Sequence, residues 1–145
     1  MVVDASVWVG IFRASDAHHE TGLAFLDAVL ARGADLHVPT LALVEVAGVF
    51  ARQSVGGTAA RRTVRALTAL PGLQSHELDM ALADKAWAIA VRCRLRGADA
   101  VYVALASQLR TPLITLDREL LDRARKVARM YTPDDWLRLQ RPPFK

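Results

Sequence analysis

Short apolar runs alternate along the chain with longer segments of helical pattern. Five runs of four to six residues are too short for helices and predict strands; they lie at 1–4, 35–38, 73–78, 112–116 and 128–131. The segments between them repeat apolar residues at helical spacing. We expect helices at 7–13, 17–31, 41–54, 58–70, 80–97, 98–109, 118–127 and 133–139.

The alternation of strands and helices predicts an α/β domain. Strands this short and apolar are typical of a parallel sheet whose two faces are both covered by helices. Crossovers between such strands are right-handed, and ligands bind beyond the carboxyl ends of the strands. No linker, internal repeat or low-complexity segment interrupts 1–145, so we expect a single domain over that range.

Several residues mark where the helices begin and end. Gly33 is suited to a helix C-terminus, and Thr40 and Asp79 are suited to N-caps. Gly56 and Gly57 break the chain before the fourth helix. The tail at 141–145 has no pattern of its own.

Composition narrows the class of protein. Apolar residues make up 52% of the chain, which excludes intrinsic disorder, and no apolar run approaches the roughly 18 residues of a membrane span. Met1–Asp4 has no secretion-signal pattern, and a single cysteine, Cys93, excludes a disulfide framework. We therefore expect a cytoplasmic protein without a membrane partner.

The excess of basic over acidic residues is compatible with an anionic partner. Nineteen Lys and Arg residues against fifteen Asp and Glu give a net charge of +4, and sixteen of the nineteen are arginine. Arginine binds phosphate through its planar fork, but a GC-rich genome would give the same composition. The excess is compatible with nucleic acid without demonstrating it.

Four acidic residues lie at positions where carboxylates are unusual. Asp4 and Asp117 end predicted strands, Asp99 opens a helix, and each of these three has helix capping as its alternative. Glu45 lies among apolar residues on its helix, and its alternative is a buried ion pair with a distant arginine.

These four acids are predicted to converge above one edge of the sheet. Carboxylates within about 4–6 Å of one another repel unless cations lie between them. Mg²⁺ and Mn²⁺ prefer oxygen ligands, and carboxylate-held metal pairs hydrolyse phosphodiesters. With the four acids neutralised, eleven acids remain against nineteen bases, which leaves a positive outer surface.

Several segments together resemble a PIN-domain ribonuclease, and in particular the VapC toxins of bacterial toxin–antitoxin pairs. The resemblance spans essentially the whole chain, and the order and spacing of the segments carry it. They are VDAS at 3–6, PTLALVEV at 39–46, RGADAVYVALA at 96–106, LITLD at 113–117 and YTPDDW at 131–136.

The resemblance implies a three-layer α/β/α fold with a parallel sheet of four or five strands. It implies Mg²⁺- or Mn²⁺-dependent endonuclease cleavage of RNA, a cognate antitoxin over the active site, and a homodimer. The family's acids correspond to Asp4, Glu45, Asp99 and Asp117. Ser6 matches a supporting hydroxyl, and Asp122 is a possible substitute for, or supplement to, Asp117.

Other conspicuous residues have simpler interpretations. Arg61 with Arg65, and Arg92 with Arg96, have the spacing to hold an RNA backbone, but solvated surface charge is favoured. His18 and His19 are favoured as surface residues over a proton relay. Buried packing is favoured for Cys93, and packing in the core or an interface for the three tryptophans, Trp8, Trp87 and Trp136.

Two competing functions remain. An aspartyl-phosphate phosphotransferase needs either a second Asp two positions after Asp4, where Ser6 stands, or a lysine after a late strand, which the predicted layout lacks. A non-catalytic module that binds RNA or protein is disfavoured, since Glu45 without a metal would only destabilise the fold.

Overall fold

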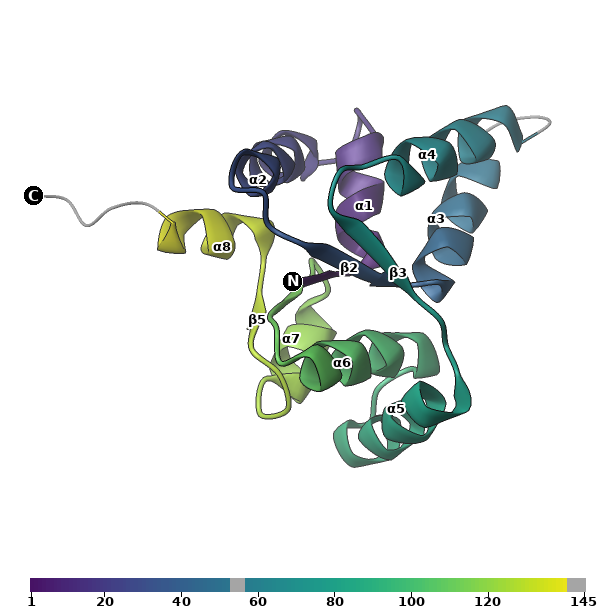
Figure 1. Ribbon diagram of the computed structural model, residues 1–145, viewed down its shortest axis with the longest axis vertical. Coiled ribbons are helices and arrows are strands. Elements are labelled where there is room, and N and C mark those ends of the chain that lie inside the picture. Colours follow the sequence, from purple (N-terminus) through teal and green to yellow (C-terminus); the bar gives the residue numbers. More distant parts are fainter. Residues whose placement is uncertain (53–56, 141–145) are drawn as a thin grey trace, which may run out of the picture.

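A parallel sheet of five strands lies at the centre of the computed structural model, which describes residues 1–52 and 57–140 (Figure 1). The strand order is β3-β2-β1-β4-β5, and every neighbouring pair is parallel. The strands are β1 (Val2–Val3), β2 (Leu36–Pro39), β3 (Leu73–His76), β4 (Leu113–Ile114) and β5 (Met130–Tyr131).

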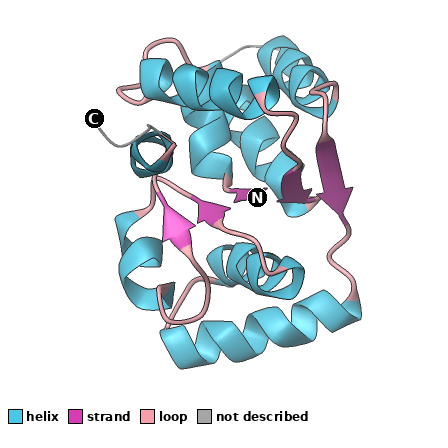
Figure 2. Ribbon diagram, turned by 60° about the vertical axis from the view of Figure 1, so that its left-hand side comes forward, coloured by secondary structure: helices cyan, strands magenta, loops and turns pink. Residues whose placement is uncertain are grey.

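Helices cover both faces of this sheet. In Figure 1, α1 to α4 lie on one side and α5 to α7 on the other, and Figure 2 shows the strands between the two helical layers. The helices are α1 (Ala5–Phe12), α2 (His19–Ala31), α3 (Leu41–Ala51), α4 (Thr58–Thr68), α5 (Met80–Cys93), α6 (Gly97–Leu109), α7 (Arg118–Ala124) and α8 (Pro133–Leu139). The predicted three-layer α/β/α fold is confirmed.

The core is apolar on both faces of the sheet. Val2, Val3, Val38, Leu113 and Ile114 are all fully buried, as strands covered on both sides require. Helix α6 is buried over residues 100–106, which explains why its sequence is apolar all round. Beyond the sheet, α8 joins α2 through an edge-to-face contact of Trp136 with Phe25.

Three predicted helix boundaries can be compared with the structure. Gly33 has φ +59° just after α2, and the Asp79 carboxylate accepts a hydrogen bond from Leu82 N at 2.8 Å, so both predictions are confirmed. Thr40 is the N-cap residue of α3, as predicted, but it has helical backbone angles and its side chain makes no capping hydrogen bond.

Helix α5 ends four residues before the expected point. Arg94 adopts a left-handed conformation with φ 54°, which stops the helix at Cys93 rather than near Gly97. The expected end of the third helix near residue 54, the break at Gly56 and the tail at 141–145 lie outside the described residues.

The tryptophans and the cysteine differ in burial. Trp8 and Trp136 are in the core, as expected, and Cys93 is partly buried against it. Trp87 is 62% exposed, so a core position is wrong for it; it lies on the outer face of α5. In the described part of the chain, no helix is long and apolar enough to cross a lipid bilayer.

Candidate active site

The candidate site lies at the carboxyl ends of β1 and β4. These two strands are adjacent and parallel, with Val3 opposite Ile114, and Asp4 N donates to Ile114 O at 2.9 Å. Asp4 follows β1 directly, and Thr115 to Asp117 follow β4. The sheet therefore brings the first and last of the four predicted acids to the same edge.

Asp4 is a buried carboxyl group held by two hydroxyls. It is 7% exposed, and its Oδ2 accepts hydrogen bonds from Ser6 Oγ at 2.5 Å and Thr115 Oγ1 at 2.8 Å. Burial raises the pKa of Asp4, the two hydroxyls oppose the rise, and the charge of Asp117 adds to it. The side chain makes no capping bond to α1, so the capping alternative for Asp4 is wrong.

The same two hydroxyls fix the backbone that leads to Asp117. Asp117 N donates to Thr115 Oγ1 at 3.0 Å, and Leu116 N donates to Ser6 Oγ at 3.1 Å. Ser6 thus supports Asp4, as the resemblance implied. Thr115 was missed; the available signal was a hydroxyl in an otherwise apolar strand, two residues before an acid.

Glu45 reaches the site from α3 and is paired with a tyrosine. Its Oε2 accepts a hydrogen bond from Tyr102 Oη at 2.5 Å. Burial raises the pKa of Glu45, the Tyr102 hydrogen bond opposes the rise, and Asp4 adds to it. A tyrosine from α6, rather than the distant arginine considered above, holds this carboxylate.

Tyr102 is a second functional residue that sequence reasoning missed. It is fully buried and lies three residues after Asp99, on the same side of α6. Burial, followed by the charge of Asp4 and the contact with Glu45, raises the pKa of the Tyr102 hydroxyl. That hydroxyl therefore stays protonated and remains a hydrogen-bond donor to Glu45.

The charges of the other three acids all raise the pKa of Asp99. Asp99 is half-buried in the first turn of α6, and its pKa is raised to about 6. Burial is the largest cause, followed by the charges of Asp117 and Asp4, with Glu45 adding to them. Arg96 acts in the opposite direction, and is the one predicted arginine whose charge bears on the acids.

Asp117 has two roles. Its Oδ1 accepts a hydrogen bond from Leu120 N at 3.0 Å, so the capping role for α7 is confirmed. Its charge also raises the pKa of Asp4 and Asp99. Asp122 is exposed on α7 and is not among the charges that shift those pKa values, which favours Asp117 as the fourth acid.

The donor set matches a hard divalent cation in chemistry. Carboxylate and hydroxyl oxygens are the ligands that Mg²⁺ and Mn²⁺ prefer, and mutually repelling carboxylates gain from a cation between them. Within 1–52 and 57–140, however, no three His, Cys, Asp or Glu side chains are gathered closely enough to hold an ion as they lie. An ion held by three of these side chains would need them to rotate toward a common point.

A groove opens beside these acids. Its volume is about 470 Å³, and the lining includes Ser6 and Glu45 from the site together with Arg13, His18, Arg52 and Leu116. Two arginines thus line the same space as one of the four site acids, Glu45, and as Asp16. His18 is exposed, as predicted, but it belongs to this groove, whereas His19 Nδ1 contacts Gly10 O at 3.1 Å.

The remaining predicted arginines, Arg61, Arg65 and Arg92, are exposed on α4 and α5. Arg61 and Arg65 line a shallow cavity on α4 with Arg62 and Thr58. Their predicted character as surface charge is consistent with this exposure.

Solved structures share this fold at low sequence identity. VapC20 from Mycobacterium tuberculosis, a Sarcin-Ricin loop cleaving toxin, has a TM-score of 0.69 and 20% identity over 83% of this chain and 92% of its own. FitAcB from Neisseria gonorrhoeae has a TM-score of 0.70 and 18% identity over 91% of this chain and 96% of its own. VapBC2 from Rickettsia felis, bound to a DNA fragment from its promoter, has a TM-score of 0.69 and 9% identity over 90% of this chain and 96% of its own.

Among curated proteins, no relative matches this sequence. The family model described as PIN domain matches residues 1–127, which is most of the chain and includes all four acids. The chain therefore belongs to the PIN domain family.

Proposed function

We propose that this protein is a metal-dependent endoribonuclease and that Asp4, Glu45, Asp99 and Asp117 form its active site. The observation that carries the proposal is the position of Asp4 and Asp117 after the adjacent strands β1 and β4, with Glu45 and Asp99 near enough for the charges of the four acids to interact. Four carboxylates from four separate segments, within electrostatic reach of one another, are typical of functional sites rather than of fold stabilisation.

The four carboxylates would hold Mg²⁺ or Mn²⁺. A bound divalent ion supplies an activated water and stabilises the leaving oxygen in phosphodiester hydrolysis. Neighbouring residues would orient the metal-binding carboxylates through hydrogen bonds: Ser6 and Thr115 orient Asp4, and Tyr102 orients Glu45. Hydrogen-bonded partners of this kind fix ligand orientation in metal sites.

The groove beside the acids suits an RNA backbone. Arg13 and Arg52 line it together with Glu45, so phosphates lying across α1 and α3 would meet guanidinium groups next to the carboxylates. RNA and the single cysteine favour a cytoplasmic location.

We further propose that the protein is the toxin of a toxin–antitoxin pair, works as a homodimer and is covered at its groove by an antitoxin. The support is the fold shared with a toxin–antitoxin complex from Klebsiella pneumoniae, at a TM-score of 0.65, and with VapBC2. The sarcin-ricin loop named for VapC20 is a sensible first substrate to test.

The experiment is cleavage of total RNA by the purified chain, with Mg²⁺ or Mn²⁺ and with EDTA. We expect cleavage only with the metal. In Asp99→Asn the cleavage rate should fall by more than about 100-fold, which is the largest loss typical of residues that only support metal ligands. Asp27→Asn, an exposed acid on α2, is the matched control. EDTA-resistant cleavage, or full activity of Asp99→Asn, would contradict the proposal; binding without cleavage would favour a non-catalytic module.

A further inference from the structure

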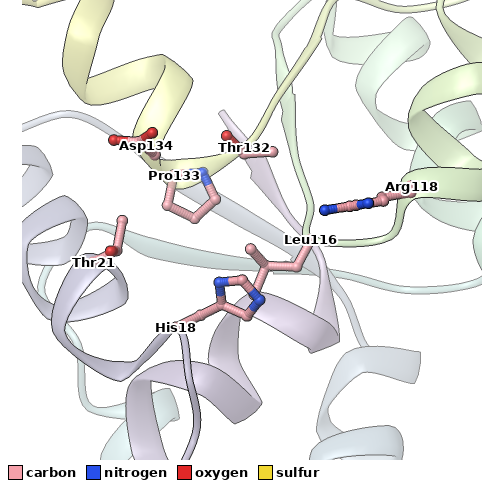
Figure 3. A pocket seen from close by; sticks show the side chains of 7 residues that line it. All are labelled: His18, Thr21, Leu116, Arg118, Thr132, Pro133 and Asp134. Atoms are coloured by element: carbon pink, nitrogen blue, oxygen red, sulfur yellow. The ribbon is translucent and has the colours of Figure 1, made fainter.

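A second cavity adjoins the groove that Ser6 and Glu45 line. Its volume is about 430 Å³, and it forms where the start of α2, the segment after β4 and the start of α8 meet (Figure 3). That volume falls within the roughly 300–1,000 Å³ typical of ligand pockets. The residues that matter here are His18, Leu116, Arg118, Pro133 and Asp134.

This cavity shares two lining residues with the groove. His18 and Leu116 line both the cavity and the groove that contains Ser6 and Glu45. Leu116 and Arg118 are also the two chain neighbours of Asp117. A strand whose phosphate lies at the four acids therefore has this cavity within reach of its next nucleotide.

The walls offer three kinds of contact at once. Figure 3 shows the His18 imidazole, the Pro133 ring and the Leu116 side chain lining the cavity, with the Arg118 guanidinium extending toward it. Imidazole, proline and leucine surfaces accept the flat face of a base, and arginine binds phosphate. Pro133 is buried, which makes this part of the wall rigid.

Asp134 adds a hydrogen-bond acceptor at the rim. Its Oδ2 pairs with Arg138 one turn along α8 at 2.6 Å, so the carboxylate is held in a defined position. A carboxylate accepts hydrogen bonds from amino groups, which guanine, adenine and cytosine carry on their edges and uracil lacks. The cavity thus has a means of distinguishing bases.

We infer that this cavity binds the nucleotide next to the cleaved phosphate of a single-stranded RNA segment, and that it sets a base preference at that position. The inference rests on the proposed ribonuclease function. The base packs against His18, Leu116 and Pro133, Arg118 binds the phosphate of the same nucleotide, and Asp134 favours a base with an amino group.

The test maps cleavage sites on an RNA pool of random sequence with three variants, His18→Ala, Arg118→Ala and Asp134→Asn. All three residues are exposed, so we expect the variants to fold. Arg125→Ala, an exposed arginine at the end of the same helix as Arg118, is the matched control. We expect Arg118→Ala to raise KM about tenfold at unchanged kcat, and Asp134→Asn to alter the base preference at one position beside the cut.

A binding assay separates this inference from the proposed function. The probe is a fluorescein-labelled single-stranded RNA of random sequence, titrated with the metal-free protein, in which no cleavage occurs. We expect Arg118→Ala and His18→Ala to weaken binding about tenfold relative to Arg125→Ala.

The outcomes are distinct. If the wild type cleaves RNA but the three variants match Arg125→Ala in KM and base preference, the inference is overturned and the ribonuclease stands. If the wild type cleaves no RNA, the proposed function fails. If, in addition, His18→Ala and Arg118→Ala bind the RNA probe as tightly as Arg125→Ala does, the subsite is overturned as well. Variants that lose only binding of a protein partner, with unchanged RNA cleavage and binding, would also overturn it.

Discussion

Thr115 donates a hydrogen bond of 2.8 Å to Asp4 across 111 residues of sequence, and both side chains are buried. The same hydroxyl accepts a hydrogen bond from Asp117 N at 3.0 Å. One side chain therefore sets the position of two of the four acids. It does so from the end of β4, the strand adjacent to β1.

Replacing Thr115 by valine tests this link. Valine keeps the shape but leaves Asp117 N without its partner and removes one of the two hydrogen bonds to Asp4 Oδ2. We therefore expect a loss of about 1–3 kcal/mol in the free energy of unfolding. We also expect a drop of about 10–100-fold in RNA cleavage, the range for residues that orient metal ligands. Urea denaturation and cleavage rates measure the two effects.

The matched control is Thr68→Val, which removes an exposed hydroxyl bonded only to helix carbonyls. Little change is expected in either measurement. If Thr115→Val cleaves RNA as fast as Thr68→Val, then Thr115 has no positioning role.

Tyr102→Phe removes the hydrogen bond to Glu45 while leaving the ring in the core. Without the donor, Glu45 loses the contact that stabilises its charged form, and we expect the Mn²⁺ concentration for half-maximal cleavage to rise about 10–100-fold. A purely structural tyrosine would instead change the melting temperature and leave the Mn²⁺ dependence alone. Tyr131→Phe, at the end of β5, is the control.

Charge repulsion among the acids predicts that Asp99→Asn stabilises the metal-free protein. The pKa of Asp99 is raised to about 6, so at pH 7.5 the carboxylate is ionised in spite of its neighbours. Removing that charge in EDTA should raise the free energy of unfolding by about 0.2–1 kcal/mol, a range limited by solvent screening at this half-exposed position. A loss of stability would mean that a favourable interaction of Asp99 outweighs the repulsion.

The candidate acids could be picked out from the sequence because they stand out from the pattern around them. Asp4 and Asp117 end apolar runs, and Glu45 stands alone in an apolar helix. Their supporting residues were not predictable in the same way. Thr115 and Tyr102 lie in segments whose other residues pack in the core, and only the three-dimensional pairing reveals their hydroxyls as partners of carboxylates.

The order of strands and helices followed from the alternation of short and long segments. The exact ends did not, because they depend on single backbone conformations such as the left-handed Arg94 that ends α5. The exposure of Trp87 also escaped sequence reasoning, since an aromatic residue in an alanine-rich helix gives no indication of which side it faces.

A separate pH effect is expected at the edge of the sheet. His37 Nδ1 lies 3.1 Å from His76 Nε2 across β2 and β3, and burial, with smaller contributions from the N-terminal amino group and His76, lowers the pKa of His37. Asp35 opposes this shift. Because the folded state takes up the His37 proton less readily than the unfolded chain, stability should fall as the pH drops below about 6.5.

The change is modest because the site is partly exposed. Between pH 7 and pH 5, the free energy of unfolding should fall less in His37→Gln than in the wild type, by a difference of about 0.5 kcal/mol. His18→Gln, an exposed histidine outside the sheet, serves as the control. Identical profiles for wild type and His37→Gln would exclude this histidine as a source of acid sensitivity.

Anomalous diffraction from a crystal grown with MnCl₂ is the sharpest test of a metal site at the four acids. We expect a manganese peak bounded by Asp4, Glu45, Asp99 and Asp117, with their side chains turned toward it and away from the positions described above. Four carboxylates pointing apart, with no peak between them, would contradict it.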